Sequence, residues 1–241
     1  MSAVMRRVGH KGAELIAPGN TPESFDAALH AGVDMIEFDV LRKRDGSGRL
    51  LLAHDYEDAD SRQPLTLDQG LAHLAGEAFA ELELDVDLKL PGYERDVLDA
   101  LRSYGLLERA LICTQYPQSL AALRALEPRA RIGWSVPRLR RDPFRTRALA
   151  LPSLVGLQVA RAGFPPRATA ALRARRCDAI MVHWRLVTGR LVREVLAAGG
   201  ELYVWTVDDP ARIRALEALG VTGVITGDPR LFASRDGDLA G

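Results

Sequence analysis

The sequence predicts a (β/α)8 TIM barrel that carries a small β-hairpin extension after its second strand. Short β-type apolar runs alternate with stretches of helical spacing along the chain. Such alternation is typical of parallel strands joined by right-handed helical crossovers. A length of 241 residues suits one barrel of this kind, so we expect a single domain over residues 1–241.

Nine apolar runs are candidate barrel strands, one more than the fold requires. They cover residues 7–10, 35–40, 84–88, 111–113, 132–136, 155–159, 180–182, 202–206 and 221–226. Either 155–159 or 180–182 should lie outside the barrel, and the sequence leaves that choice open. An open doubly wound sheet is the alternative architecture, but no glycine-rich phosphate loop follows the first run.

Helix boundaries are predicted by residues that suit helix ends. Thr21 is a suitable N-cap, Pro22 fits the first helical position, and Gly32 should end that helix. Asp209 and Gly220 bound a second predicted helix in the same way.

Turn residues predict the hairpin. The Asp-Gly-Ser-Gly turn at residues 45–48 should fold residues 50–53 back antiparallel on residues 40–43. The basic segment 138–147 contains proline and is expected to form a solvated loop.

Composition disfavours several classes of partner and location. The 32 basic and 32 acidic residues give a net charge of +0, so we expect no nucleic-acid partner. Cys113 and Cys177 lie far apart without metal-ligand spacing, as expected for reduced thiols. The amino terminus lacks the apolar core of a signal peptide, and no run approaches the ~20 residues of a membrane helix. We therefore expect a cytoplasmic protein without a transmembrane segment; oligomeric state is left open.

Two pairs of charged residues lie near the carboxyl ends of predicted strands, where barrels place functional side chains. Glu37 and Asp39 are two residues apart, so both carboxylates should point to one face of their strand. Hard cations such as Mg²⁺ or Ca²⁺ prefer oxygen ligands. Charged and apolar residues alternate over 81–90, and there Asp87 and Lys89 could add a metal ligand and a phosphate-neutralising cation. A half-exposed edge strand is the alternative for that segment.

Two histidines are candidates for proton transfer. His10 follows the first strand, and His54 ends the hairpin, from which it could fold over the barrel mouth. An imidazole pKa near ~6.5 suits a base that activates a nucleophile and an acid that protonates a leaving oxygen. His183 ends a strand and could also line the mouth. Trp205 ends another strand, where it could form an apolar wall for a substrate or pack in the core.

Seven short motifs, in order, resemble those of the glycerophosphodiester phosphodiesterase family. They are His10-Lys11-Gly12, Pro18-Gly19-Asn20-Thr21, Ile36-Glu37-Phe38-Asp39-Val40, His54-Asp55, Val86-Asp87-Leu88-Lys89, Val204-Trp205-Thr206-Val207-Asp208 and Gly223-Val224-Ile225-Thr226-Gly227-Asp228-Pro229. Each motif is weak alone, but the ordered set covers nearly the whole chain. The resemblance implies a (β/α)8 barrel, a divalent cation, and hydrolysis of glycerophosphodiesters to glycerol 3-phosphate and an alcohol.

The resemblance also implies a role for each matched residue. By position, it assigns the metal ligands Glu37, Asp39 and Asp87, the acid and base His10 and His54, the phosphate contacts Lys11 and Lys89, and the substrate-facing Trp205.

Three substitutions depart from the family pattern. Lys11 replaces the usual Arg and loses its bidentate fork, while Asp87 replaces a Glu that is one methylene longer. Gly19 replaces a Glu, and we hypothesise that losing this acid compensates for losing the guanidinium. Only about thirty residues separate His54 from Asp87, which predicts a more open site than in many relatives.

Three functions are compatible with these residues. The leading hypothesis is a metal-dependent glycerophosphodiesterase with a small-molecule substrate, in which either the glycerol 2-hydroxyl or a water attacks. A lysophospholipase D-like activity on bulkier lipids keeps the reaction and changes the substrate. A barrel that binds phosphorylated ligands without catalysis is the third.

Overall fold

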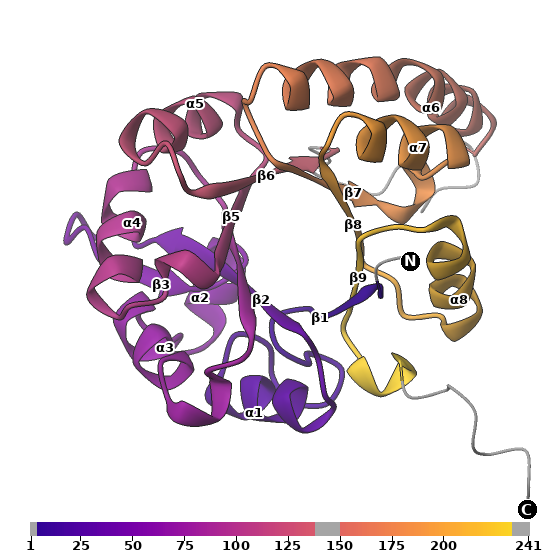
Figure 1. Ribbon diagram of the computed structural model, residues 1–241. Coiled ribbons are helices and arrows are strands. Elements are labelled where there is room, and N and C mark those ends of the chain that lie inside the picture. Colours follow the sequence, from indigo (N-terminus) through magenta and orange to yellow (C-terminus); the bar gives the residue numbers. More distant parts are fainter. Residues whose placement is uncertain (1–3, 138–149, 233–241) are drawn as a thin grey trace, which may run out of the picture.

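Eight parallel strands form a closed barrel in the computed structural model, which describes residues 4–137 and 150–232 (Figure 1). The strands of the ring are β1 (Arg6–Gly9), β2 (Met35–Arg42), β4 (Glu83–Leu88), β5 (Ala110–Thr114), β6 (Arg131–Val136), β7 (Ala179–His183), β8 (Glu201–Trp205) and β9 (Gly223–Thr226). Pairing of β1 with both β2 and β9 closes the ring. The predicted (β/α)8 barrel is confirmed.

Helices surround the strands as an outer layer (Figure 1). They are α1 (Pro22–His30), α2 (Tyr56–Ser61), α3 (Leu67–Leu74), α4 (Glu94–Ser103), α5 (Pro117–Leu126), α6 (Ala150–Arg173), α7 (Gly189–Ala197) and α8 (Pro210–Leu219). Short 3-10 turns are η1 (Glu77–Phe79), η2 (Leu107–Arg109), η5 (Trp184–Leu186) and η6 (Pro229–Phe232). The main apolar core lies between strands and helices. Among the described residues, no helix is long and apolar enough to cross a bilayer.

The predicted hairpin is present. Strand β3 (Leu50–Leu52) pairs antiparallel with the end of β2, with Leu52 opposite Val40 and Leu50 opposite Arg42. It therefore lies outside the ring, and its loop leads back toward the barrel mouth.

The predicted helix ends also hold. Thr21 caps α1 through the backbone N–H of Ser24, and Gly32, with φ of 71°, follows the last turn. Asp209 caps α8, which ends at Gly220 in the left-handed conformation.

The predicted strand at residues 155–159 is wrong, because that run belongs to α6. Residues 180–182 instead lie in β7. Since β6 and β7 are parallel neighbours, their connection must cross outside the barrel, and a helix serves that crossover. A short apolar run has no decisive period, so the sequence could not separate the two cases. The predicted loop at 138–147 lies outside the described residues.

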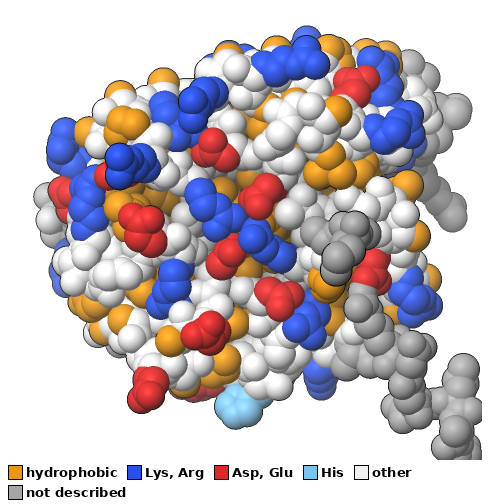
Figure 2. All heavy atoms as spheres, in the orientation of Figure 1, with side chains coloured by type: hydrophobic (Ala, Val, Ile, Leu, Met, Phe, Trp, Pro, Cys, Tyr) orange, Lys and Arg blue, Asp and Glu red, His pale blue; other side chains and the backbone are white. Residues whose placement is uncertain are grey.

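The barrel interior has polar ends and an apolar middle. At the amino end, Arg6 and Arg131 alternate with Glu83 and Glu201, joined by ion pairs of 2.8–3.1 Å. An apolar layer above this ring includes Val8, Met35, Leu111, Met181 and Ile225. Figure 2 shows basic and acidic side chains mixed over the face that it presents, consistent with the balanced net charge.

A glycine in this interior supplies a test of the packing. A Cβ at Gly133 would lie 2.4 Å from Cys113 Sγ, so Gly133→Ala should overpack the barrel and lower the free energy of unfolding by about 1–3 kcal/mol. Gly156 in α6 has open space around its Cβ position, and Gly156→Ala should raise stability by about 0.5–1 kcal/mol. Urea denaturation of both variants measures the difference, and equal effects would contradict the described interior.

Candidate active site

A cavity of ≈ 170 Å³ lies at the carboxyl ends of the strands. Six of the predicted site residues line it: His10, Glu37, His54, Asp87, Lys89 and Trp205. Two others, Lys11 and Asp39, lie directly behind these side chains, as their contacts below show. The eight residues thus meet in one place although they come from five separate segments of the chain.

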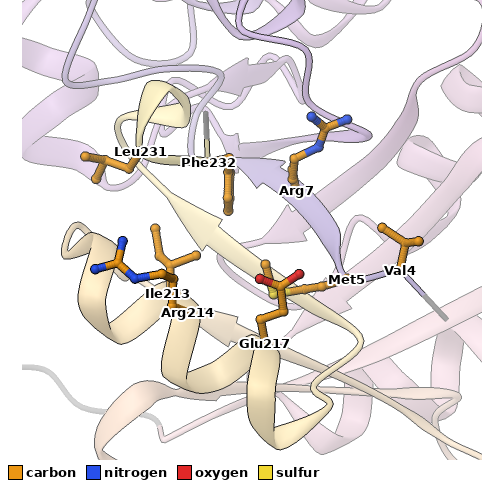
Figure 3. Close-up of a pocket in the computed structure, with 8 residues that line it drawn as sticks. All are labelled: Val4, Met5, Arg7, Ile213, Arg214, Glu217, Leu231 and Phe232. Carbon is orange, nitrogen blue, oxygen red and sulfur yellow. The ribbon is translucent and has the colours of Figure 1, made fainter. Parts of the chain in front are cut away.

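A second cavity, of ≈ 210 Å³, lies beside the start of β1, between α8 and η6 (Figure 3). Its lining includes Val4, Met5, Ile213 and Phe232 and none of the predicted site residues. We therefore place the candidate site in the cavity at the carboxyl ends.

Three carboxylates converge there. Glu37, Asp39 and Asp87 each offer an oxygen, and these three atoms lie within 4.8 Å of one another. The strand register causes this, because Asp39 of β2 stands directly opposite Asp87 of β4. Glu37 and Asp39 share one face of β2, as their spacing predicted.

Lys89 and Asn20 hold the acidic cluster. The Lys89 Nζ lies 2.5 Å from Asp39 Oδ1 and 2.6 Å from Asp87 Oδ2. Asn20 Nδ2 donates to Asp39 Oδ2 at 2.9 Å, and Asn20 Oδ1 accepts from the Asp39 backbone N–H at 3.1 Å. Burial would raise the pKa of Asp39, but the positive charge of Lys89 and then Lys11 holds it well below its usual range.

Glu37 behaves differently from its neighbour. Burial, followed by the negative charge of Asp39, raises the pKa of Glu37 to about 7. The backbone N–H of Lys11 donates to Glu37 Oε2 at 2.7 Å, which fixes the carboxylate beside His10. Deeper in the barrel, Asp85 is also buried, and burial raises its pKa well above the usual range.

His10 lies between two acids. Its Nδ1 contacts Glu14 Oε1, and its Nε2 lies 3.8 Å from Glu37 Oε2. Burial alone would lower the pKa of His10, but the charges of Glu37 and Glu14 outweigh it and raise that pKa.

Glu14 also contacts Lys11, whose Nζ lies 2.9 Å from Glu14 Oε2. Glu14 therefore supplies a carboxylate beside Lys11, while compensation between the changes at Gly19 and Lys11 stays a hypothesis. Sequence reasoning missed both Glu14 and Asn20. Asn20 lies within the Pro18-Gly19-Asn20-Thr21 motif, whereas the only sequence signal for Glu14 is its position four residues after His10.

His54 reaches the same cavity from the loop after β3. Its side chain is 51% exposed, and Nδ1 lies 3.0 Å from Asp55 Oδ2. The backbone N–H of His54 donates to Asp58 Oδ2 at 3.0 Å, which ties the loop to the first turn of α2. The predicted position of His54 at the barrel mouth is confirmed.

Aromatic rings gather around Trp205, which lines the cavity. Trp205 also packs on the inner apolar layer, and its role as a wall for a substrate stays a prediction. Its indole Nε1 is buried without a hydrogen-bond partner among the described residues. His183 meets the edge of Trp205 at 5.2 Å between ring centroids and stacks on Trp184 at 5.5 Å.

The raised pKa of Glu37 makes a prediction for the metal-free protein. Between its ordinary pKa of 4.5 and about 7, folded Glu37 binds more protons than unfolded Glu37. The free energy of unfolding should therefore fall as pH rises through this window, by up to about 1.4 kcal/mol per pH unit. Thermal unfolding at pH 5 and pH 8 should show that Glu37→Gln reduces the fall. The variant Glu108→Gln, at an exposed acid, is the control and should show the same decrease in stability as the parent. A decrease in Glu37→Gln as large as in the parent would contradict the raised pKa of Glu37.

Comparison with known proteins identifies the family to which this chain is related. A model of the glycerophosphoryl diester phosphodiesterase family matches residues 10–73 and 77–231. The chain is 27% identical over 262 residues to "Glycerophosphodiester phosphodiesterase GDPD4" of Arabidopsis thaliana, covering 95% of this chain and 73% of that one. It is 23% identical over 258 residues to a glycerophosphodiester phosphodiesterase of Caldanaerobacter subterraneus, covering 92% and 93%.

Solved structures show the same fold. The chain is similar to a phosphodiesterase from Oleispira antarctica in complex with the product sn-glycerol-3-phosphate, with a TM-score of 0.70, 19% identity and 97% of each chain covered. The glycerophosphoryl diester phosphodiesterase structure from Silicibacter pomeroyi gives a TM-score of 0.69 and 22% identity, covering 96% of this chain and 92% of that one. Together with the family match over most of its length, these likenesses show that the chain is an enzyme of the glycerophosphoryl diester phosphodiesterase family.

Proposed function

We propose that this protein hydrolyses glycerophosphodiesters to glycerol 3-phosphate and an alcohol, with metal-ion assistance. The observation that carries the proposal is one cavity lined by two histidines, a lysine and two of three clustered carboxylates, with the third, Asp39, directly behind them. The product named for the Oleispira antarctica structure supports the substrate class.

The acidic cluster fits a hard divalent cation, which we propose to be Mg²⁺ or Ca²⁺. Glu37, Asp39 and Asp87 supply only oxygen ligands, and Asp87 Oδ1 is buried without a hydrogen-bond partner among the described residues. A cation held by these three residues would polarise the phosphoryl oxygens and neutralise charge that develops in the transition state.

His10 and His54 are proposed as the proton-transfer pair. His10 presents Nε2 toward Glu37 and the cavity, while His54 approaches from the β3 loop. One imidazole removes the proton from the attacking hydroxyl, either the glycerol 2-hydroxyl or water, and the other protonates the leaving oxygen.

Positive and aromatic side chains complete the proposed substrate site. The ammonium groups of Lys11 and Lys89 lie near the carboxylate cluster, and their proposed role is to neutralise the phosphate, each as a point charge. Trp205 provides an apolar wall for the glycerol or alcohol part.

A second candidate substrate is a lysophospholipid. The half-exposed His54 ring indicates an open mouth on the hairpin side, where a bulky leaving alcohol or acyl chain has room. Turnover of a lysolipid much faster than of glycerophosphocholine would favour this candidate over the water-soluble diesters.

The proton-transfer assignment predicts the behaviour of histidine variants. His10→Ala and His54→Ala should each lower kcat for release of glycerol 3-phosphate from glycerophosphocholine by about 10²–10⁴-fold, because each removes one proton-transfer group. His73→Ala is a matched control, since His73 contacts Asp26 at 2.9 Å and is not among the cavity-lining residues. Parental turnover by His10→Ala would refute the assignment.

The metal assignment predicts the behaviour of the chelated enzyme. EDTA should abolish turnover, and Mg²⁺ or Ca²⁺ should restore it, because the three clustered acids otherwise repel the phosphate. Thermal unfolding with each cation reports binding separately from activity. Cation-dependent stabilisation with no turnover of any diester would instead support a barrel that only binds phosphorylated ligands.

A further inference from the structure

We propose that Glu14 is the positioning residue of this active site: it orients the His10 imidazole and the Lys11 ammonium together, in space that Gly19 leaves free. The proposal deepens the function proposed above and rests on it for the role of His10. The geometry of the three side chains stands independently of that role.

The loop after β1 brings Glu14 onto His10. The Glu14 backbone N–H donates to the His10 carbonyl at 3.3 Å, a single helical turn that puts residues four apart on one side. The turn is anchored at both ends, because His10 N–H donates to Thr226 O at 2.8 Å and Leu15 N–H donates to Gly227 O at 2.9 Å. Backbone bonds to β9 and its loop therefore fix the position of Glu14.

The Glu14 carboxylate contacts both the His10 imidazole and the Lys11 ammonium. Glu14 Oε1 contacts His10 Nδ1, and Glu14 Oε2 lies 2.9 Å from Lys11 Nζ. All three side chains are largely shielded, with 19% of His10, 26% of Glu14 and 19% of Lys11 exposed. Burial would raise the pKa of Glu14, but His10 and Lys11 lower it to about 2, so the group stays ionised.

The consequence for His10 is a fixed tautomer. A carboxylate at Nδ1 keeps the proton on that nitrogen and leaves Nε2 to exchange protons with whatever occupies the cavity. The same arrangement holds the ring at a set angle, so proton transfer does not wait for a rotation. Glu14 does not line the cavity, which is why it positions rather than reacts.

Gly19 makes room for this arrangement. A Cβ at residue 19 would lie 2.9 Å from Lys11 Cβ and 3.1 Å from Glu14 Cβ. The side chains of Lys11 and Glu14 therefore occupy the volume that a larger residue at position 19 would need. In this proposal the substitutions at positions 11 and 19 depend on each other. Gly19 leaves room for the side chains of Lys11 and Glu14, and Glu14 supplies the carboxylate that pairs with Lys11.

Activity measurements on the full-length, metal-loaded enzyme test the role. Glu14→Gln keeps the shape and removes the charge, and should lower kcat by about 10- to 100-fold while KM changes much less. Glu14→Asp should recover part of the loss because it restores the charge. Asp26→Asn is the matched control, since it removes the carboxylate charge from the His73–Asp26 pair outside the cavity and should leave kcat unchanged. Parental kcat in Glu14→Gln, or a loss that falls mainly on KM, would overturn the proposal.

A spectroscopic measurement separates this proposal from the proposed function. Long-range ¹H–¹⁵N spectra of the full chain without metal, at a pH where the ring is neutral, report which nitrogen of His10 carries the proton. The parent should show the Nδ1–H tautomer, and Glu14→Gln should lose that preference. An Nε2–H tautomer in the parent overturns the positioning role whatever the activity. If the enzyme is inactive but His10 shows the Nδ1–H tautomer, the proposed reaction is refuted and the orientation of His10 by Glu14 is still supported.

The role of Gly19 is tested by a double-mutant cycle. Gly19→Ala should lower kcat by pressing on Lys11 and Glu14, and the Glu14→Gln/Gly19→Ala pair should lose less than the sum of the two single effects. Thermal unfolding checks that each variant is folded. Fully additive losses would show that the two residues act separately and would contradict the coupling.

Discussion

The site depends on the register between β2 and β4. This pairing sets Asp39 opposite Asp87 and Glu37 opposite Asp85, so four acids face the interior of one barrel. Burying like charges side by side is costly in the low-dielectric interior. Lys89 offsets the repulsion by contacting the carboxylates of Asp39 and Asp87. The Asn20 side-chain amide donates to the Asp39 carboxylate and accepts from the Asp39 backbone N–H. A slip of β4 by one residue would turn Asp85, Asp87 and Lys89 toward the helices and leave Glu37 and Asp39 without these neighbours.

The rest of the barrel confines this concentration of charge to one end. Its amino end is closed by the ion-paired ring of Arg6, Glu83, Arg131 and Glu201, and its middle is filled by apolar side chains. The acidic cluster therefore rests on a packed layer and opens in one direction only, toward the cavity. The three layers, ion-paired, apolar and acidic, keep the reactive groups at the carboxyl end of the barrel, where TIM-barrel enzymes have their active sites.

Strands and loops divide the work of the site. The carboxylates and Lys89 come from β2, β4 and the residue that follows β4, where the ladder fixes them. The proton-transfer candidates come from connections: His10 follows β1, as does the positioning residue Glu14, and His54 follows the hairpin strand β3. Loops tolerate sequence change better than strands. A carboxylate at position 14 and a glycine at position 19 are therefore compatible with an unchanged acidic cluster on the strands.

The sequence by itself determined the barrel, the hairpin and the spacing of Glu37 and Asp39, because periodicity, caps and turns are local properties of the chain. It also selected the eight site residues that the structure brings together around one cavity. Whether residues 155–159 formed a strand was decided only by the tertiary structure, since a short apolar run suits either a strand or a helix until its neighbours are known. The contacts of Glu14 with His10 and Lys11, and the space at Gly19, were likewise invisible beforehand. They depend on how the loop after β1 is bonded to β9, which lies more than 200 residues further along the chain.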